Sequence, residues 1–180
     1  MNRYRHIDAL QLARECIELG ARMSTVELVS GIGHSQLKRL FFSHGEMPPC
    51  GRRPNAPEWL FERAKVEGAA EASLVAVIFE ELHHAGASYT CALVAAYRLY
   101  RARCASTPLV SFDRAFDVIC CLYGLWTSRT VELQLHRCSA CGSRYLGSMH
   151  SPSVKAAKCP FCVLLRRHTQ ERHQSEAHIV

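Results

Sequence analysis

One C-terminal stretch, residues 138–162, reads CSACGSRYLGSMHSPSVKAAKCPFC and contains two Cys-x2-Cys pairs with 17 residues between them. The four cysteines are Cys138, Cys141, Cys159 and Cys162. Each pair can bend back so that both sulfur atoms face one point, and Gly142 and Pro160 suit the tight turns that this needs. Four thiolates around one point are the ligand set of a structural zinc ion. The spacing therefore predicts one zinc ion per chain; two disulfides or four unrelated thiols are the alternatives.

A site with four cysteine ligands leaves no coordination position open for water, so its role is structural rather than catalytic. The sequence also contains no His-Glu-x-x-His, no Gly-x-Ser-x-Gly and no phosphate-binding loop with a following Lys-Ser/Thr. These observations argue against an enzyme.

Composition indicates where the protein resides. Six cysteines lie outside the motif, mostly within apolar helical patterns where a thiol acts as a small hydrophobic group; they are Cys16, Cys50, Cys91, Cys104, Cys120 and Cys121. This usage fits a reducing compartment. No apolar run of about 18 residues is present, and the first residues lack a signal-peptide pattern. We therefore expect a cytoplasmic protein that does not cross a membrane.

The net charge of +6 is concentrated near the cysteine motif. Residues 127–180 contain 8 Lys/Arg and 3 Asp/Glu, whereas residues 1–126 contain 14 and 13. A local basic excess favours a polyanionic partner such as DNA, although a solvated basic tail is the simpler alternative. A zinc-organised frame would present basic side chains to DNA phosphates. The candidates near the motif are Arg144, Lys155, Lys158, Arg166 and Arg167.

Residues 22–43 have the spacing of a helix-turn-helix, whose second helix enters the major groove of DNA. Ser24 and Glu27 form a possible capping box for a helix over 25–30, and Gly31 can end that helix. A second helix is predicted to run through Phe42, with four apolar positions that would lock the pair: Val26, Ile32, Leu37 and Leu40. Lys38 and Arg39 would face DNA, but two ordinary core helices explain the pattern equally well.

The rest of the chain predicts helices and one small hairpin. Apolar periodicity predicts helices over 7–21, 58–84, 88–104 and 111–126, with residues 72–79 buried in a core or an interface, strands at 130–136 and 144–146, and a basic helix from residue 163. Four prolines interrupt the linker at about 45–58. We therefore predict a mainly α-helical fold, with a helical domain over 1–126. A small zinc-ribbon-like four-cysteine module with a basic tail follows over 127–180.

Several segments resemble one family, the flagellar transcriptional activator subunit FlhC. They are residues 17–22 (Ile-Glu-Leu-Gly-Ala-Arg), the Pro48-Pro49 loop running to Trp59, residues 96–100 (Ala-Tyr-Arg-Leu-Tyr), and the two cysteine pairs. The resemblance covers nearly the whole chain. It implies a cytoplasmic DNA-binding activator that forms a hetero-oligomer with FlhD, binds double-stranded promoter DNA and recruits RNA polymerase.

Two other functions remain open from the residues alone. A zinc-stabilised protein–protein adaptor would bind a protein partner and show no salt-dependent affinity for DNA. A thiol-based redox sensor would need a labile zinc ion and an accessible cysteine of low pKa.

Overall fold

Helices make up most of the described chain in the computed structural model. Residues 3–42, 48–49, 51, 57–62, 65–104, 107–149 and 158–177 are described. The α-helices are α1 (Arg3–Glu18), α2 (Met23–Ser30), α3 (His34–Phe41), α4 (Val66–His84), α5 (Tyr89–Arg103), α6 (Phe112–Tyr123) and α7 (Pro160–Ala177). A short 3-10 helix, η1 (Pro57–Phe61), and two strands, β1 (Leu133–Arg137) and β2 (Arg144–Ser148), complete the set. The predicted fold class, mainly α-helical with a small C-terminal four-cysteine module, is confirmed.

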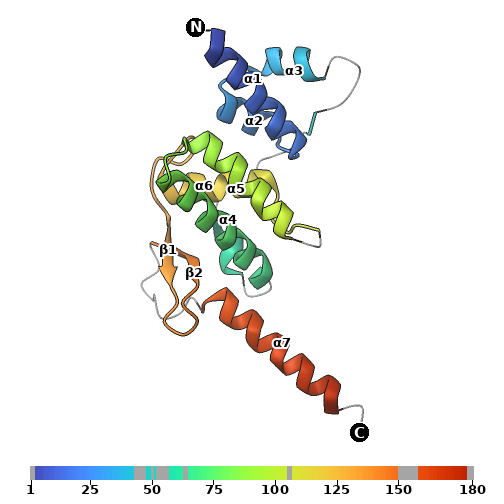
Figure 1. Cartoon of the computed structure of the whole chain (residues 1–180), viewed down its shortest axis with the longest axis vertical. Coiled ribbons are helices and arrows are strands. Elements are labelled where there is room, and N and C mark those ends of the chain that lie inside the picture. Colours follow the sequence, from blue (N-terminus) through green and yellow to red (C-terminus); the bar gives the residue numbers. More distant parts are fainter. Residues whose placement is uncertain are drawn as a thin grey trace.

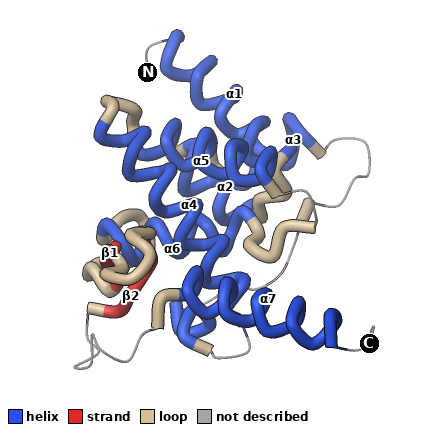
Figure 2. The backbone as a smooth tube through the Cα atoms, turned by 60° about the horizontal axis from the view of Figure 1, so that its bottom comes forward, coloured by secondary structure: helices blue, strands red, loops and turns tan. Residues whose placement is uncertain are grey.

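The elements follow one another along the longest axis of the molecule (Figure 1). Helices α1 to α3 form one end, and α4, α5 and α6 form the middle. The antiparallel β1–β2 hairpin lies beside the lower part of α4, and α7 projects away at the other end. Figure 2 shows the same separation of α7 from α1 and α3. Within the described residues, no helix is long and apolar enough to cross a membrane.

One hydrophobic core joins these parts. Its largest fully buried side chains come from α4, α5 and α6 and include Phe79, Tyr100, Phe112 and Phe116. The apolar stretch at residues 72–79 lies in this core, where a helix that is apolar nearly all round is expected. Leu133 of β1 and Leu146 of β2 belong to the same cluster. The hairpin therefore packs through shared apolar side chains on the helical body, the name used below for α1 to α6.

Helices α5 and α6 begin at local signals in the sequence. The hydroxyl of Ser88 accepts a hydrogen bond from the amide of Cys91, and that of Ser111 accepts one from Arg114. The predicted cap at Ser88 is therefore confirmed. Helix α6 ends at Tyr123 rather than at the predicted residue 126, because Gly124 adopts the left-handed conformation at φ 64°.

Helix α2 starts differently from its prediction. Its N-cap is Arg22, without a side-chain cap, and Ser24 lies inside the helix, so the predicted capping box is wrong. Asp113, at the start of α6, takes over this role. Its carboxylate accepts hydrogen bonds from the Arg22 amide at 3.2 Å and the Thr25 hydroxyl at 2.6 Å. A buried carboxylate 88 residues away from Thr25 thus holds the N-cap amide of α2 and the Thr25 hydroxyl.

Two further expectations are corrected. Leu40 does not lock α2 against α3, because it is 46% exposed, whereas Val26, Ile32 and Leu37 are buried as predicted. The single helix expected over 58–84 is two elements, η1 and α4. The buried indole of Trp59 in η1 lies against Gly68 of α4, with the Arg114 guanidinium 4.9 Å from the ring centroid. A continuous helix would carry Trp59 away from both contacts.

Candidate metal centre

Two turns bring the cysteine pairs together. Cys138 and Cys141 lie between β1 and β2, where the Gly142 amide donates to the Cys138 carbonyl and the Cys138 amide donates to the Ser143 carbonyl, both at 2.9 Å. Gly142 has φ +73°, a conformation that favours glycine. The second pair lies at the start of α7, where Cys159 directly precedes Pro160 and Cys162 falls in the first turn. The hairpin turn and the start of α7 therefore face each other.

The four sulfur atoms have the separations of a tetrathiolate metal site. All lie within 4.8 Å of one another, and the Cys138–Cys162 and Cys141–Cys159 sulfur pairs are both 3.7 Å apart. Zinc–sulfur bonds of about 2.3 Å in a tetrahedron place sulfur atoms about 3.8 Å apart. Disulfide sulfurs are about 2.05 Å apart, so the two-disulfide alternative does not describe this arrangement. The four cysteines could hold one metal ion.

Local hydrogen bonds make the first pair more acidic than ordinary thiols. The Ser143 hydroxyl and amide lower the pKa of Cys141 to about 6, and the amides of Cys141 and Ala140 lower the pKa of Cys138. The second pair shifts the other way. Burial raises the pKa of Cys159, and hydrogen bonds with the Cys141 and Cys138 sulfurs raise the pKa of Cys162 to about 12. A divalent cation at the centre would stabilise all four thiolates, because it adds positive charge where four sulfurs crowd together.

Two contacts that the sequence did not reveal attach the hairpin to α4. The buried Ser73 hydroxyl accepts a hydrogen bond from the Leu146 amide at 3.1 Å and donates one to the Ala69 carbonyl at 2.7 Å. Glu80 forms an ion pair with Arg144. A lone serine in the apolar run 72–79 was the available signal for the first contact. No local pattern marks the second.

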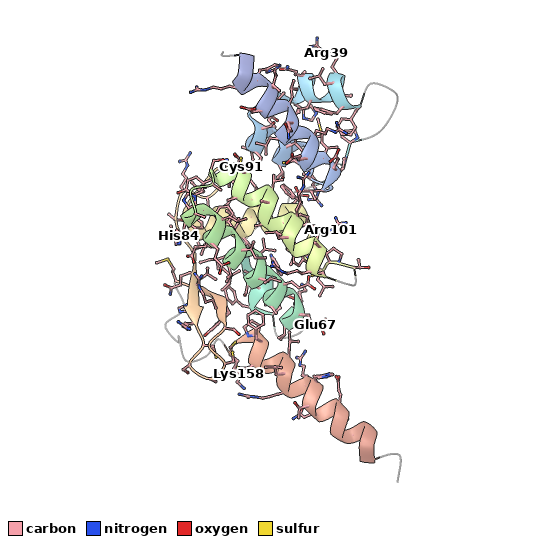
Figure 3. The ribbon with its side chains drawn as sticks, in the orientation of Figure 1. Arg39, Glu67, His84, Cys91, Arg101 and Lys158 are labelled. Carbon is pink, nitrogen blue, oxygen red and sulfur yellow. The ribbon has the colours of Figure 1, made fainter. Side chains whose placement is uncertain are left out.

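The basic candidates near the metal centre lie in different environments. Lys158, Arg166 and Arg167 are exposed, and Figure 3 shows Lys158 at the start of α7. Arg144 is engaged by Glu80 within the chain. Lys155 lies outside the described residues. The exposed candidates at this end therefore come from the segment that starts α7.

Lys38 and Arg39 are both exposed and lie in the last turn of α3. Figure 3 shows Arg39 at one end of the molecule and Lys158 on the other side of α4 and α5, at the start of α7. Among the described residues, the predicted basic candidates thus fall into two separate groups, with α4, α5 and α6 between them. It does not bring all the predicted DNA-facing residues onto one surface.

Comparison with known proteins shows similarity over most of the chain. Residues 4–175 match the family described as flagellar transcriptional activator (FlhC). A flagellar transcriptional regulator FlhC from Serratia marcescens is 29% identical, over 85% of this chain and 77% of the relative. The FlhC regulator of Xenorhabdus nematophila is 26% identical, over 92% and 84%. That of Cupriavidus pinatubonensis is 30% identical, over 84% and 70%.

Proposed function

The chain belongs to the FlhC family of flagellar transcriptional activators, and from this premise we propose that it activates flagellar operons by binding promoter DNA. In this proposal it acts in the cytoplasm, in a hetero-oligomer with FlhD, and recruits RNA polymerase. The family is one of transcriptional regulators rather than of enzymes. The observation that supports this proposal most strongly is the family match over residues 4–175, which includes both the α2–α3 pair and the cysteine cluster.

We propose that one zinc ion cross-links the hairpin end, which consists of β1, β2, the turn between them and the start of α7. Cys138, Cys141, Cys159 and Cys162 would hold it, because four sulfurs within 4.8 Å match its preferred ligands and geometry. Zinc supplies cross-linking and no reaction at such a site. The chain's own contribution is to fix the start of α7 against the β1–β2 turn, which sets the position of the basic side chains that follow.

Phosphate contacts are proposed for the α7 end. Lys158, Arg166 and Arg167 are exposed cations close to a fixed point in the fold, so they can meet a DNA backbone in a defined register. Lys155 is assigned to the same surface from its sequence position alone. Arg144 would contribute only if a phosphate replaced Glu80 as its partner.

The α2–α3 pair is proposed as a second DNA contact. Recognition helices read base edges chiefly with their N-terminal residues, whereas Lys38 and Arg39 occupy the last turn of α3. These two residues are therefore better placed for phosphates than for bases. Helix α3 has only 8 residues, which limits the length of groove that it can follow.

A gel-shift titration on a flagellar promoter fragment tests the proposal. The chain would be titrated alone, with co-expressed FlhD, and with FlhD as the Cys159→Ser, Cys162→Ser variant, each at two salt concentrations. We expect binding that needs both chains and the intact Cys159–Cys162 pair and that weakens at the higher salt. Binding to FlhD without affinity for DNA would instead support the adaptor function.

Charge reversal then locates the residues that bind phosphate. Lys158→Glu with Arg166→Glu should weaken binding and lower the slope of log affinity against log salt by about 0.9 for each phosphate that the variant no longer neutralises. The matched control is Arg101→Glu with Arg103→Glu, two exposed arginines on α5 that give the same change in charge. Equal effects of reversal at both places would show general electrostatics rather than a DNA surface at the start of α7.

A further inference from the structure

Ser73 and Glu80 lie seven residues apart on α4, which places them two turns apart on one face of that helix. Both contact β2, the strand that leaves the cysteine turn. Figures 1 and 2 place the hairpin beside α4 and α6. One face of α4 thus holds the hairpin at two points.

The Ser73 contact satisfies the outer edge of the two-stranded sheet. In the antiparallel register Leu135 pairs with Leu146, yet the Leu146 amide donates to Ser73 rather than to β1. A buried amide at a sheet edge needs a partner, and the serine hydroxyl provides it from the helix. Because that hydroxyl also donates to Ala69, it is fixed in one orientation.

Apolar contacts continue this attachment into the core. Leu133 and Leu146 are 1% and 6% exposed and lie in the same cluster as Phe79. The Glu132 amide, just before β1, donates to the carbonyl of Cys121 in α6 at 2.8 Å. Helix α4 also packs against α7, which carries the second cysteine pair. Both cysteine pairs are therefore held by elements that rest on α4.

We propose that Ser73 and Glu80 are positioning residues for the metal centre, and that through them metal binding stabilises the helical body as well as the hairpin. The ion would fix the hairpin turn to the start of α7, and both pack on α4. Ordering them would order the face of α4 that carries Ser73. Removal of the ion would correspondingly loosen the core around α4 and α6. This inference rests on the proposed metal site but not on DNA binding.

The test uses the full chain and two readouts other than DNA binding. Cobalt(II) titration, followed by thiolate-to-metal charge-transfer absorption, reports metal affinity. Far-ultraviolet circular dichroism, with and without a chelator, reports thermal unfolding of the helices. We expect chelation to lower the unfolding temperature of most of the helical signal. Ser73→Ala should weaken cobalt affinity about ten-fold and reduce that shift, because the buried Leu146 amide loses its hydrogen-bond partner.

The chain offers a closely matched control for the serine. On α2, the Ser30 hydroxyl donates to the Val26 carbonyl at 2.7 Å and accepts from the Ile32 amide, far from the hairpin. Ser30→Ala should lower the unfolding temperature but leave cobalt affinity and the chelation shift unchanged. If Ser73→Ala does not fold, Glu80→Gln is compared with Glu18→Gln, whose partner is Arg14 on the exposed face of α1.

The outcomes separate the two proposals. Normal cobalt binding with no effect of chelation on the helical signal would overturn the coupling while leaving the metal site standing. The coupling would also be overturned if cobalt affinity fell equally in Ser73→Ala and Ser30→Ala, or equally in Glu80→Gln and Glu18→Gln. Absence of a cobalt–thiolate band in the parent chain would reject the metal site, and the coupling with it.

Discussion

The buried cysteines of α1 and α6 and the Cys138–Cys141 pair in the turn between β1 and β2 have opposite environments in this chain. Cys16, Cys120 and Cys121 are buried in the apolar core. Burial raises the pKa of both Cys16 and Cys121 to about 12. At the hairpin end four sulfurs converge, and hydrogen bonds to Ser143 lower the pKa of Cys141 to about 6.

The surroundings of a thiol therefore decide its chemistry. In the body, a cysteine replaces a small hydrophobic side chain, and its sulfur is kept as a neutral thiol. At Cys138 and Cys141, backbone amides and the Ser143 hydroxyl donate to sulfur and favour the thiolate, which is the form that binds metal. The pKa values of Cys159 and Cys162 are raised instead, so a bound cation is what would favour their thiolates. Four predictions test this contrast, from the largest expected effect to the smallest.

Removing the second cysteine pair should have the largest effect. Metal binding at a tetrathiolate site contributes on the order of 10 kcal/mol to folding of the segment that it cross-links. We expect the Cys159→Ser, Cys162→Ser variant to lose the increase in urea resistance that zinc gives the parent. The control is Cys91→Ser, an exposed cysteine of α5. If zinc stabilised the variant as strongly as the parent, Cys159 and Cys162 would not be metal ligands, and the two groups of cysteines would not differ in this way.

Alkaline pH should destabilise the body through its buried thiols. Cys16 has an ordinary pKa of 9.0 that burial raises to about 12, so between these values the unfolded chain releases a proton that the folded chain keeps. The contribution of Cys16 to the free energy of unfolding is fully present below pH 9 and is lost as pH rises toward 12. The loss is at most about 4 kcal/mol. Urea unfolding of the parent and of Cys16→Ala across this range should give a shallower decline for the variant. Identical slopes would show that Cys16 does not contribute.

Cys16→Ser should cost about 1–3 kcal/mol, because a hydroxyl replaces a thiol in a fully buried apolar site. Its zinc affinity should stay at the parent value, since α1 packs mainly against α2 and α5 rather than against the hairpin. Chemical denaturation and a competitive zinc titration measure the two quantities. A fall in zinc affinity would mean that the two groups of cysteines are not separate.

Two glycines give the smallest and sharpest test. Gly20 after α1 has φ +81° and Gly142 in the cysteine turn has φ +73°, and a methyl group at either would meet no atom within 4 Å. Alanine should therefore cost about 1 kcal/mol at both positions through backbone strain alone. Only Gly142→Ala should also weaken zinc binding. Equal zinc affinities would show that the turn tolerates distortion.

The features that rest on local chemistry could be predicted from the sequence. Ser88 marked the start of α5, the alternation near residue 133 marked a strand, and the repeated Cys-x2-Cys spacing marked the convergence of four sulfurs. Each depends on residues close together in the chain or on a spacing that geometry allows in few ways. A short window of sequence therefore contains all the information that such a feature needs.

Contacts between distant segments could not be predicted in this way. Asp113 replaces the capping box that Ser24 was expected to form, and Glu80 engages Arg144 across 64 residues. The helix expected over 58–84 is η1 and α4, and the Trp59 indole of η1 packs against Gly68 and under Arg114. In each case a residue from a distant segment makes the deciding contact. The periodicity of a single segment contains no information about which distant residue that is.

The zinc content of the full chain tests the central claim most directly. The chain and its Cys159→Ser, Cys162→Ser variant would be purified without added chelator and measured by inductively coupled plasma mass spectrometry against protein concentration. We predict about one zinc ion per parent chain and almost none in the variant. A parent chain without stoichiometric zinc, or a variant that keeps it, would contradict the assignment of these four cysteines as the metal centre.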